Sequence, residues 1–336
     1  MVENIHTWVI LFKVARKGSK MKVACVGVHI LDVLGRPVVE VPKGQGIALI
    51  EEIRITVAGT AGGTAVDLAK LGAEVTCIGA LGSDEIGHIV RGILRRFGID
   101  DSGLVAKEGV QTSSTMLPIR PNGERPALHV MGANAVFSEQ DVDLDSLKIY
   151  DAVHVGGTYL MPSFDGSGAA VVLKHAQDAG ALTTMDVLSI SRDDMMSVLE
   201  PSLPFLNFFM PNLEEAQMIT GLEKADDIAR LFLDKGVETV ILKMGELGSV
   251  IYSAEVGEER VPAYAADVVD TTGCGDAYNG GLIYGMCSGL GVIESARLGS
   301  ACGSLVATGL GSDAGIVDLA TVRNFMARTK PLNVAK

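Results

Sequence analysis

The stretch Asp270-Thr271-Thr272-Gly273-Cys274-Gly275-Asp276 places two glycines beside a carboxylate. Gly273 and Gly275 have no Cβ, so their backbone can approach a ligand closely. Asp276 stands at the expected start of a helix, where the first amide groups have no intrahelical partner. Those amides and the positive end of the helix dipole favour a phosphate or another anion. The stretch therefore predicts an anion-binding turn at a helix N-terminus.

A carboxylate beside an anion site repels the anion unless it has a chemical task there. Asp276 has such a task if it takes a proton from a hydroxyl group that attacks a phosphate. A simpler interpretation is that Asp276 caps the helix in a glycine-rich turn without any ligand. A short glycine-rich motif by itself leaves both interpretations open.

The composition limits the kinds of molecule that the protein binds. The chain has 336 residues, 48% of them hydrophobic, and a formal net charge of −13 without a basic block. This charge argues against nucleic acid as the main ligand. No apolar run approaches the roughly 18 residues of a membrane-spanning helix, so we expect no membrane partner either. ATP stays compatible with the charge, because an anion site needs only local amides and one or two cations.

The five cysteines lie far apart and form no C-x-x-C pair. An odd number of scattered cysteines fits neither a disulfide framework nor a zinc site. We therefore expect reduced thiols in a cytoplasmic protein.

Short apolar runs alternate with segments of helical periodicity from Met21 onward. This alternation predicts an α/β protein with a mostly parallel central sheet and helices on both faces. Residues 34–57 and 110–131 have strand and turn character without a helical period, so they predict hairpins outside the main sheet. We expect residues 1–20 to be an N-terminal extension and residues 21–330 to form a single domain that contains these two insertions.

Four polar or glycine positions follow strand-like runs of the sequence: Asp32, Gly59, Asn212 and Asp276. Ligands of parallel sheets bind beyond the carboxyl ends of the strands. We therefore expect these four residues to line one crevice.

The stretch from Asp270 to Asp276 resembles D-T-T/V-G-A-G-D, the C-terminal signature of the ribokinase-like (PfkB) carbohydrate kinases. Residues 58–72, A-G-T-A-G-G-T-A-V-D-L-A-K-L-G, resemble the N-terminal signature of the same family. The resemblance implies a ribokinase-like three-layer α/β/α fold in which a small β-strand lid closes over the substrate. It also implies an ATP- and Mg²⁺-dependent phosphotransferase that moves the γ-phosphate to a hydroxyl group of a sugar or sugar-like alcohol.

The resemblance assigns roles to individual residues. Asp276 is implied to be the catalytic base, and the anion hole is implied to consist of Gly273, Cys274 and Gly275. The substrate side is implied to contain Asp32, Gly59, Gly63 and Asp276. The nucleotide side is implied to contain Asn212, Glu215, Lys243, Gly245, Gly248, Thr271, Gly273 and Gly275. Glu215 is expected to hold Mg²⁺ through water, and Asp270 to border a site for a monovalent cation such as K⁺.

Simpler interpretations remain for several of these residues. Asn212, followed by two acidic residues, caps a helix equally well, and Asp32 fits a turn. Lys243 fits a solvated surface lysine. Cys274 is either a small buried residue or a modestly activated thiol, since a helix N-terminus lowers a thiol pKa while Asp276 opposes this effect.

Two departures from the family pattern affect the expected substrate. Gly63 replaces an asparagine that usually touches the substrate, so we expect extra room on the substrate side. A larger substrate would fit this space, so a nucleoside kinase with the same fold remains an alternative. Thr308-Gly309-Leu310-Gly311 replaces the usual T-R-x-G beside the cation site, which leaves K⁺ activation open.

Two other classes of protein are weaker alternatives. A non-catalytic sugar-binding regulator has no need of the base Asp276. A dinucleotide-dependent oxidoreductase would need a G-x-G-x-x-G loop after the first strand, and residues 58–63 do not have that spacing. Exposed lid strands pair readily with one another, so we expect a homodimer through the lid.

Overall fold

The computed structural model describes residues 20–122, 124–188, 190 and 192–333. The expected N-terminal extension, residues 1–20, lies outside the described residues except for Lys20.

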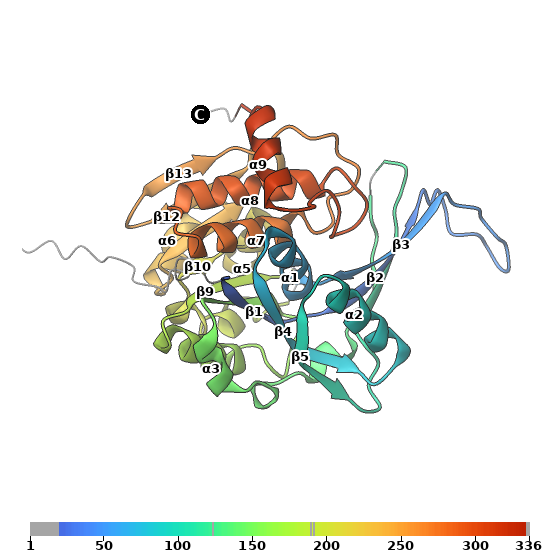
Figure 1. Ribbon diagram of the computed structural model, residues 1–336, viewed down its shortest axis with the longest axis horizontal. Coiled ribbons are helices and arrows are strands. Elements are labelled where there is room, and N and C mark those ends of the chain that lie inside the picture. Colours follow the sequence, from blue (N-terminus) through green and yellow to red (C-terminus); the bar gives the residue numbers. More distant parts are fainter. Residues whose placement is uncertain (1–19, 123, 189, 191, 334–336) are drawn as a thin grey trace, which may run out of the picture.

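A nine-stranded sheet forms the centre of the molecule. In chain order its strands are β1 (Lys22–Gly27), β4 (Glu74–Gly82), β5 (Asp100–Lys107), β8 (Ala152–Thr158), β9 (Leu182–Val187), β10 (Phe208–Phe209), β11 (Thr239–Lys243), β12 (Ser249–Ser253) and β13 (Gly257–Val261). They lie in the order β13-β12-β11-β10-β9-β8-β1-β4-β5 (Figure 1). All neighbours from β5 to β11 are parallel, whereas β12 and β13 add an antiparallel edge. The sheet is therefore mostly parallel, as predicted.

Side chains that alternate along β1 divide the core into two halves. Val23 and Cys25 pack with α1 (Thr60–Leu71), α2 (Glu85–Arg96), α7 (Cys274–Cys287) and α8 (Val292–Val306). Ala24 and Val26 pack with α3 (Ser167–Asp178), α5 (Leu213–Thr220) and α6 (Ala225–Asp234). Successive residues of a strand point to opposite faces of the sheet, so the two groups of helices cover opposite faces. The result is a three-layer α/β/α sandwich.

The remaining helices are short or peripheral. They are α4 (Met195–Leu199) and α9 (Leu319–Arg328), with 3₁₀ turns η1 (Gly132–Val136), η2 (Glu139–Asp141), η3 (Leu144–Ile149), η4 (Leu203–Phe205) and η5 (Gly245–Leu247). Among the described residues, no helix is both long and apolar enough to cross a membrane.

A second sheet of four strands, here called the lid, has the order β3-β2-β6-β7. Its strands are β2 (Ile30–Arg36), β3 (Glu52–Ala58), β6 (Ser114–Pro118) and β7 (Leu128–Val130). The β2–β3 hairpin projects from the body of the molecule at the right of Figure 1. A mostly parallel α/β/α core with a small β lid confirms the predicted fold class.

The chain passes from the main sheet into the lid directly after β1. Gly27 has φ 131°, and a Cβ at this position would lie 2.1 Å from Gly156 O. The lid strand β2 then begins at Ile30, so Asp32 lies inside a lid strand. The prediction that Asp32 follows a strand, or sits in a turn, is therefore wrong. Apolar residues continue from β1 through Gly27 into β2, so the sequence does not show where the chain passes from one sheet to the other.

Candidate active site

The turn that precedes α7 adopts the conformation that its glycines permit. Gly273 is the N-cap of α7, with φ 80°, in the left-handed region that favours glycine. A Cβ on Gly273 would lie 2.5 Å from Ser312 Cα, so close packing against the loop at Ser312 also requires glycine. Asp276 is the third residue of α7 rather than its cap. The interpretation of Asp276 as a helix N-cap is therefore wrong.

Asp276 packs against α1. Thr64 Oγ1 of α1 donates a hydrogen bond to the backbone oxygen of Asp276 at 3.2 Å. A Cβ on Gly63 would lie 2.5 Å from Asp276 Oδ2, so the carboxylate already occupies the space beside Gly63. The expected extra room for substrate at Gly63 is therefore wrong, because the space is filled by the predicted catalytic base.

The carboxyl group of Asp276 titrates near neutral pH. The residue is partly accessible, but protein atoms surround its carboxyl group, and this burial raises the pKa of Asp276 to about 7. The negative charge of Asp186 raises this pKa further, while Lys243 lowers it. Asp32 and Glu215 also raise it, so all four charges lie within electrostatic reach of Asp276. A base with a pKa close to the working pH is well suited to proton abstraction.

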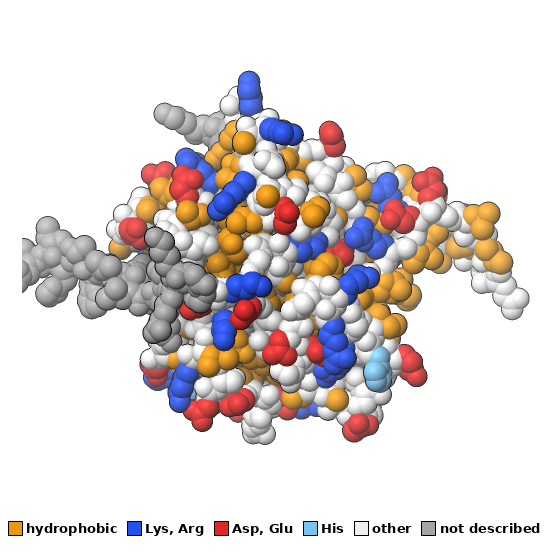
Figure 2. Space-filling model, in the orientation of Figure 1, with side chains coloured by type: hydrophobic (Ala, Val, Ile, Leu, Met, Phe, Trp, Pro, Cys, Tyr) orange, Lys and Arg blue, Asp and Glu red, His pale blue; other side chains and the backbone are white. Residues whose placement is uncertain are grey.

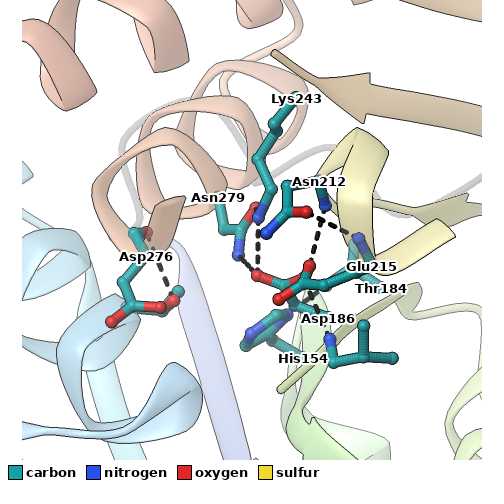
Figure 3. Close-up of polar contacts among 10 residues, drawn as sticks. His154, Thr184, Asp186, Asn212, Glu215, Lys243, Asp276 and Asn279 are labelled. Carbon is teal, nitrogen blue, oxygen red and sulfur yellow. Dashed lines mark hydrogen bonds and ion pairs between the residues drawn. The ribbon is translucent and has the colours of Figure 1, made fainter. Parts of the chain in front are cut away.

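Lys243, at the end of β11, points into a buried polar cluster. Its Nζ lies 2.6 Å from Asp186 Oδ2 and 3.4 Å from Asn279 Oδ1. Asn279 Nδ2 donates to the same oxygen of Asp186 at 2.6 Å (Figure 3). A Cβ on Gly275 would lie 3.2 Å from Lys243 Nζ, so the ammonium group borders the predicted anion hole. The interpretation of Lys243 as a solvated surface lysine is wrong.

Asp186 and Asn279 are polar site residues that the sequence analysis missed, although the sequence contains a signal for each. Asp186 follows the strand-like run 182–185, in the pattern that singled out other residues near strand ends. Asn279 lies three residues after Asp276, and residues with this spacing share a helix face. The contact between the two is visible only in the tertiary structure, because 93 residues separate them.

Asn212 and Glu215 form a capping box at the start of α5. Asn212 Oδ1 accepts a hydrogen bond from Glu215 N, and Glu215 Oε2 accepts one from Asn212 N, both at 2.8 Å (Figure 3). The capping interpretation of Asn212 is therefore confirmed. Figure 3 also places both residues beside Asp186 and near Lys243.

Asp270, which was predicted to border a monovalent-cation site, accepts hydrogen bonds from two loops. Its Oδ1 accepts hydrogen bonds from Thr272 N at 3.0 Å and from Thr272 Oγ1 at 2.8 Å. Its Oδ2 accepts one from Gly311 N at 2.9 Å. Thr271, the neighbouring residue assigned to the nucleotide side, is exposed. Asp270 thus fixes the turn before α7 to the loop that contains Gly311.

One face of the lid, here called its inner face, carries polar residues within electrostatic reach of Asp276. In the register of the lid strands, Asp32 lies opposite Thr56 and Thr115, and Thr115 lies opposite His129. Residues that are directly opposite in a sheet share one face, and Thr115 Oγ1 lies 3.1 Å from His129 Nδ1. Burial raises the pKa of Asp32 to about 7, and a hydrogen bond from Thr115 opposes this rise.

Arg125 connects the lid to the turn before α7, although no motif in the sequence singles out this residue. Its Nη1 donates a hydrogen bond to Thr272 Oγ1 at 2.7 Å, across 147 residues of sequence. The residue lies between β6 and β7 and remains exposed.

The thiol of Cys274 is not activated. Burial raises its pKa to about 12, while the charge of Arg125 lowers it and those of Asp270 and Asp276 raise it. The predicted modest activation is therefore wrong, and the interpretation of Cys274 as a small, largely buried residue agrees with the structure. All five cysteines are free.

The remaining predicted glycines serve backbone turns. Gly59 precedes α1 with φ 84°, and a Cβ there would lie 2.7 Å from Val28 O. Gly245 and Gly248 flank the turn between β11 and β12, and a Cβ on Gly248 would lie 2.0 Å from Val261 O. The structure thus explains Gly59 and Gly248 by close packing within the protein.

The α/β/α sandwich with a β lid over a carboxylate at a helix N-terminus defines a ribokinase-like kinase fold. The model of the pfkB family carbohydrate kinases matches residues 20–318. The chain therefore belongs to the PfkB family of carbohydrate kinases, which confirms the predicted family and the prediction of an ATP-dependent phosphotransferase.

Three similar proteins illustrate this relationship. An uncharacterized sugar kinase of Archaeoglobus fulgidus is 29% identical over 234 residues, which are 69% of this chain and 91% of that protein. Fructokinase-1 of Oryza sativa subsp. japonica is 26% identical over 289 residues, 81% of this chain and 89% of that enzyme. The structure of Arabidopsis thaliana ribokinase complexed with ribose and ATP has a TM-score of 0.77 and 22% identity, and covers 92% of this chain and 99% of its own.

Proposed function

We propose that the protein transfers the γ-phosphate of ATP to a hydroxyl group of a sugar or sugar-like alcohol, with Asp276 as the general base. The observation that carries the proposal is a carboxyl group with a pKa of about 7 in the first turn of α7, within electrostatic reach of the lid residue Asp32. A helix N-terminus favours the phosphate, and the carboxylate can accept the proton of the attacking hydroxyl.

In the proposed reaction, Asp32 binds substrate hydroxyl groups beneath the lid, close to the turn at Gly59 and to Gly63 in the first turn of α1. Asp276 removes the proton from the attacking hydroxyl. The backbone of Gly273, Cys274 and Gly275, at the start of α7, stabilises the charge on the transferring phosphoryl group. Closure of the lid excludes water, which would otherwise accept the phosphoryl group.

We place the phosphates of ATP among Lys243, Asn212 and Glu215. The turn at Gly245 and Gly248 and the residue Thr271, in the separate turn before α7, complete the proposed nucleotide side. The related Arabidopsis ribokinase has been crystallised with ribose and ATP, which supports a nucleotide on this fold. Lys243 supports the assignment best, because its ammonium group borders Gly275.

Mg²⁺ fits the donor set of this crevice. Among the described residues, no three acidic, histidine or cysteine side chains group tightly enough to form a metal cage. Mg²⁺ in nucleotide sites keeps several waters and uses one or two carboxylates together with the phosphates. Glu215, and Asp186 beside it, would hold such an ion through water. When bound, Mg²⁺ neutralises charge that develops on the phosphates.

A monovalent cation beside Asp270 stays a prediction. Both carboxylate oxygens already accept hydrogen bonds from the surrounding loops, so a cation there would share them. The cytoplasmic location expected from the cysteines also stays a prediction.

We further propose a homodimer that forms through the outer face of the lid. In the strand register, Ile55, Val33, Met116 and Leu128 lie opposite one another in one apolar row. Ile55, Met116 and Leu128 are exposed, as are Val39 and Ile47 on the projecting hairpin, where Figure 2 has hydrophobic side chains. Exposed apolar strands of this kind are normally covered by a partner.

The test of the proposed function is ATP consumption with Mg²⁺ across a panel of sugars, sugar acids and nucleosides. We expect turnover with at least one sugar or sugar-like alcohol, and product analysis would identify the phosphorylated hydroxyl. Turnover with nucleosides alone would favour the alternative of a nucleoside kinase. Binding of a sugar without any turnover would favour a non-catalytic regulator.

A further inference from the structure

Arg125 of the lid stands where the sugar side and the phosphate side of the proposed reaction meet. Its positive charge lowers the pKa of Asp32 on the inner face of the lid, and also that of Cys274 in the predicted anion hole. Its Nη1 contacts Thr272, the residue before Gly273. One guanidinium group therefore reaches both halves of the site.

The present partner of Arg125 leaves its charge uncompensated. Thr272 is neutral, and its hydroxyl already donates a hydrogen bond to Asp270 Oδ1 at 2.8 Å. Among the described residues, Arg125 makes no ion pair within 4.0 Å, and the residue is exposed. An arginine that donates to one neutral hydroxyl retains further N–H groups for a ligand.

The charges around the proposed site explain why a phosphoryl group would need this residue. Four carboxylates act on the site, those of Asp32, Asp186, Asp270 and Asp276, whereas Lys243 is already paired with Asp186. A phosphoryl group that moves past these carboxylates carries negative charge on its three outer oxygens, and cations that contact those oxygens stabilise the transition state. A planar guanidinium group binds two such oxygens at once.

We propose that Arg125 is a catalytic residue which the lid supplies to the transferring phosphoryl group. This inference rests on the proposed function. The hydroxyl oxygen of the sugar forms a bond to the γ-phosphorus while the bond from phosphorus to the β,γ-bridging oxygen breaks, and ADP leaves with that electron pair. The proton of the hydroxyl passes to Asp276. Arg125 keeps its proton and donates hydrogen bonds to the outer oxygens of the transferring phosphoryl group.

One consequence is that the lid contributes to the rate as well as to sugar binding. Arg125 lies between β6 and β7, so its position depends on the lid strands that also carry Asp32 and Thr115. A bound sugar that contacts Asp32 holds these strands, and with them the guanidinium group, beside the phosphoryl group, whereas a water molecule makes too few contacts to do so. Hydrolysis of ATP without sugar should therefore be slow.

The experiment compares Arg125→Gln and Arg125→Lys with wild type on the best substrate of the panel. We expect Arg125→Gln to lower kcat by about 10²- to 10³-fold with small changes in the KM values, the size observed when one donor to a transition-state charge is removed. Arg125→Lys should recover part of the loss. A complex of the enzyme with ADP, Mg²⁺, aluminium fluoride and sugar mimics the transferring phosphoryl group. Arg125→Gln should weaken the retention of ADP in this complex. The Kd for ATP, measured without fluoride, should stay within about threefold of wild type.

Arg120→Gln is the matched control. Arg120 belongs to the same lid segment, but its guanidinium group donates to the backbone oxygens of Val38 and Val39 within the lid. It should keep kcat within about threefold of wild type and should retain ADP in the fluoride complex.

Several outcomes would overturn the inference. Arg125→Gln with a kcat within about threefold of wild type would show that the residue does not contact the phosphoryl group. A rise in the KM for sugar alone would show that Arg125 only holds the lid closed. A loss of activity confined to anionic sugars would show that Arg125 binds the substrate instead. Absence of turnover by wild type on the whole panel would instead contradict the proposed function itself.

Discussion

Lys243 Nζ lies 2.6 Å from Asp186 Oδ2, and the two side chains are only 11% and 3% exposed. The pair joins β11 to β9 and borders both Gly275 and Asp276. Its two charges act on Asp276 in opposite directions, since Asp186 raises the pKa of Asp276 and Lys243 lowers it. Burial is the main cause of the raised pKa of Asp276, and the pair adjusts that pKa further.

Asp276→Asn tests the base directly. Asparagine has nearly the same shape but cannot accept the proton, so we expect kcat to fall by about 10²- to 10⁴-fold. ATP and sugar binding, measured by calorimetry, should persist. A variant with a kcat near that of wild type would refute the assignment of Asp276.

The activity should depend on pH around neutrality. A base must be deprotonated to work, and Asp276, with a pKa of about 7, is mostly protonated below that pH. We therefore expect kcat/KM to fall as the pH decreases through about 7, and to level off above it. Burial also raises the pKa of Asp32 to about 7, so the acidic limb can be steeper than for one group. A flat profile from pH 5 to 8 would contradict the proposed base.

The Lys243–Asp186 pair should shift that profile in opposite directions. Asp186→Asn removes a negative charge and should move the acidic limb to lower pH, whereas Lys243→Met removes a positive charge and should move it to higher pH. A charge that lies beside a carboxyl group typically shifts its pKa by roughly one unit or more. The measurement is the pH dependence of kcat/KM for each variant, and shifts in the same direction would show that Asp276 is not the titrating group.

Lys243→Met should also destabilise the fold. It leaves the carboxylate of Asp186 buried without its ammonium partner, and breaking a buried pair in this way costs about 3–5 kcal/mol. Asn279 Nδ2 still donates to Asp186, so the loss should lie toward the lower end of that range. Urea unfolding would measure the free energy, and an unchanged midpoint would contradict the role of the pair in stability.

Gly63→Ala tests the contact between α1 and Asp276. The new Cβ would lie 2.5 Å from Asp276 Oδ2, so the carboxylate has to move. A displacement of about 1 Å in a reacting group can lower the rate by about 10²-fold. Gly92→Ala is the matched control, because Gly92 is also helical and a Cβ there meets nothing within 4 Å. It should retain activity and add about 0.5–1 kcal/mol of stability. Equal activity of both variants would show that Gly63 does not position Asp276.

Cys274→Ala should remain active within about threefold of wild type. The thiol has a pKa of about 12, so little thiolate exists at neutral pH and alkylation should be slow. Rapid inactivation of wild type by iodoacetamide at pH 7, with protection in Cys274→Ala, would contradict the raised pKa.

The sequence by itself determined the features that depend on neighbours along the chain. Strands and helices follow from short apolar runs and helical periods, and the glycines around Cys274 predict a turn that opens a helix. The N-cap at Asn212 was likewise predictable, since the acidic residues that follow it mark the first turn of a helix. Such patterns involve residues that are close along the chain, so they can be predicted without knowing how distant segments pack.

Only the tertiary structure decided how residues far apart in the sequence share the site. Asp186 meets Lys243 because β9, β10 and β11 lie side by side, with β10 pairing to both. Gly63 supports Asp276 rather than making room for substrate, because α1 packs closely on α7. Arg125 reaches Thr272 because the lid folds back onto the main domain. These contacts arise from packing between elements, and no local pattern of residues encodes which elements become neighbours.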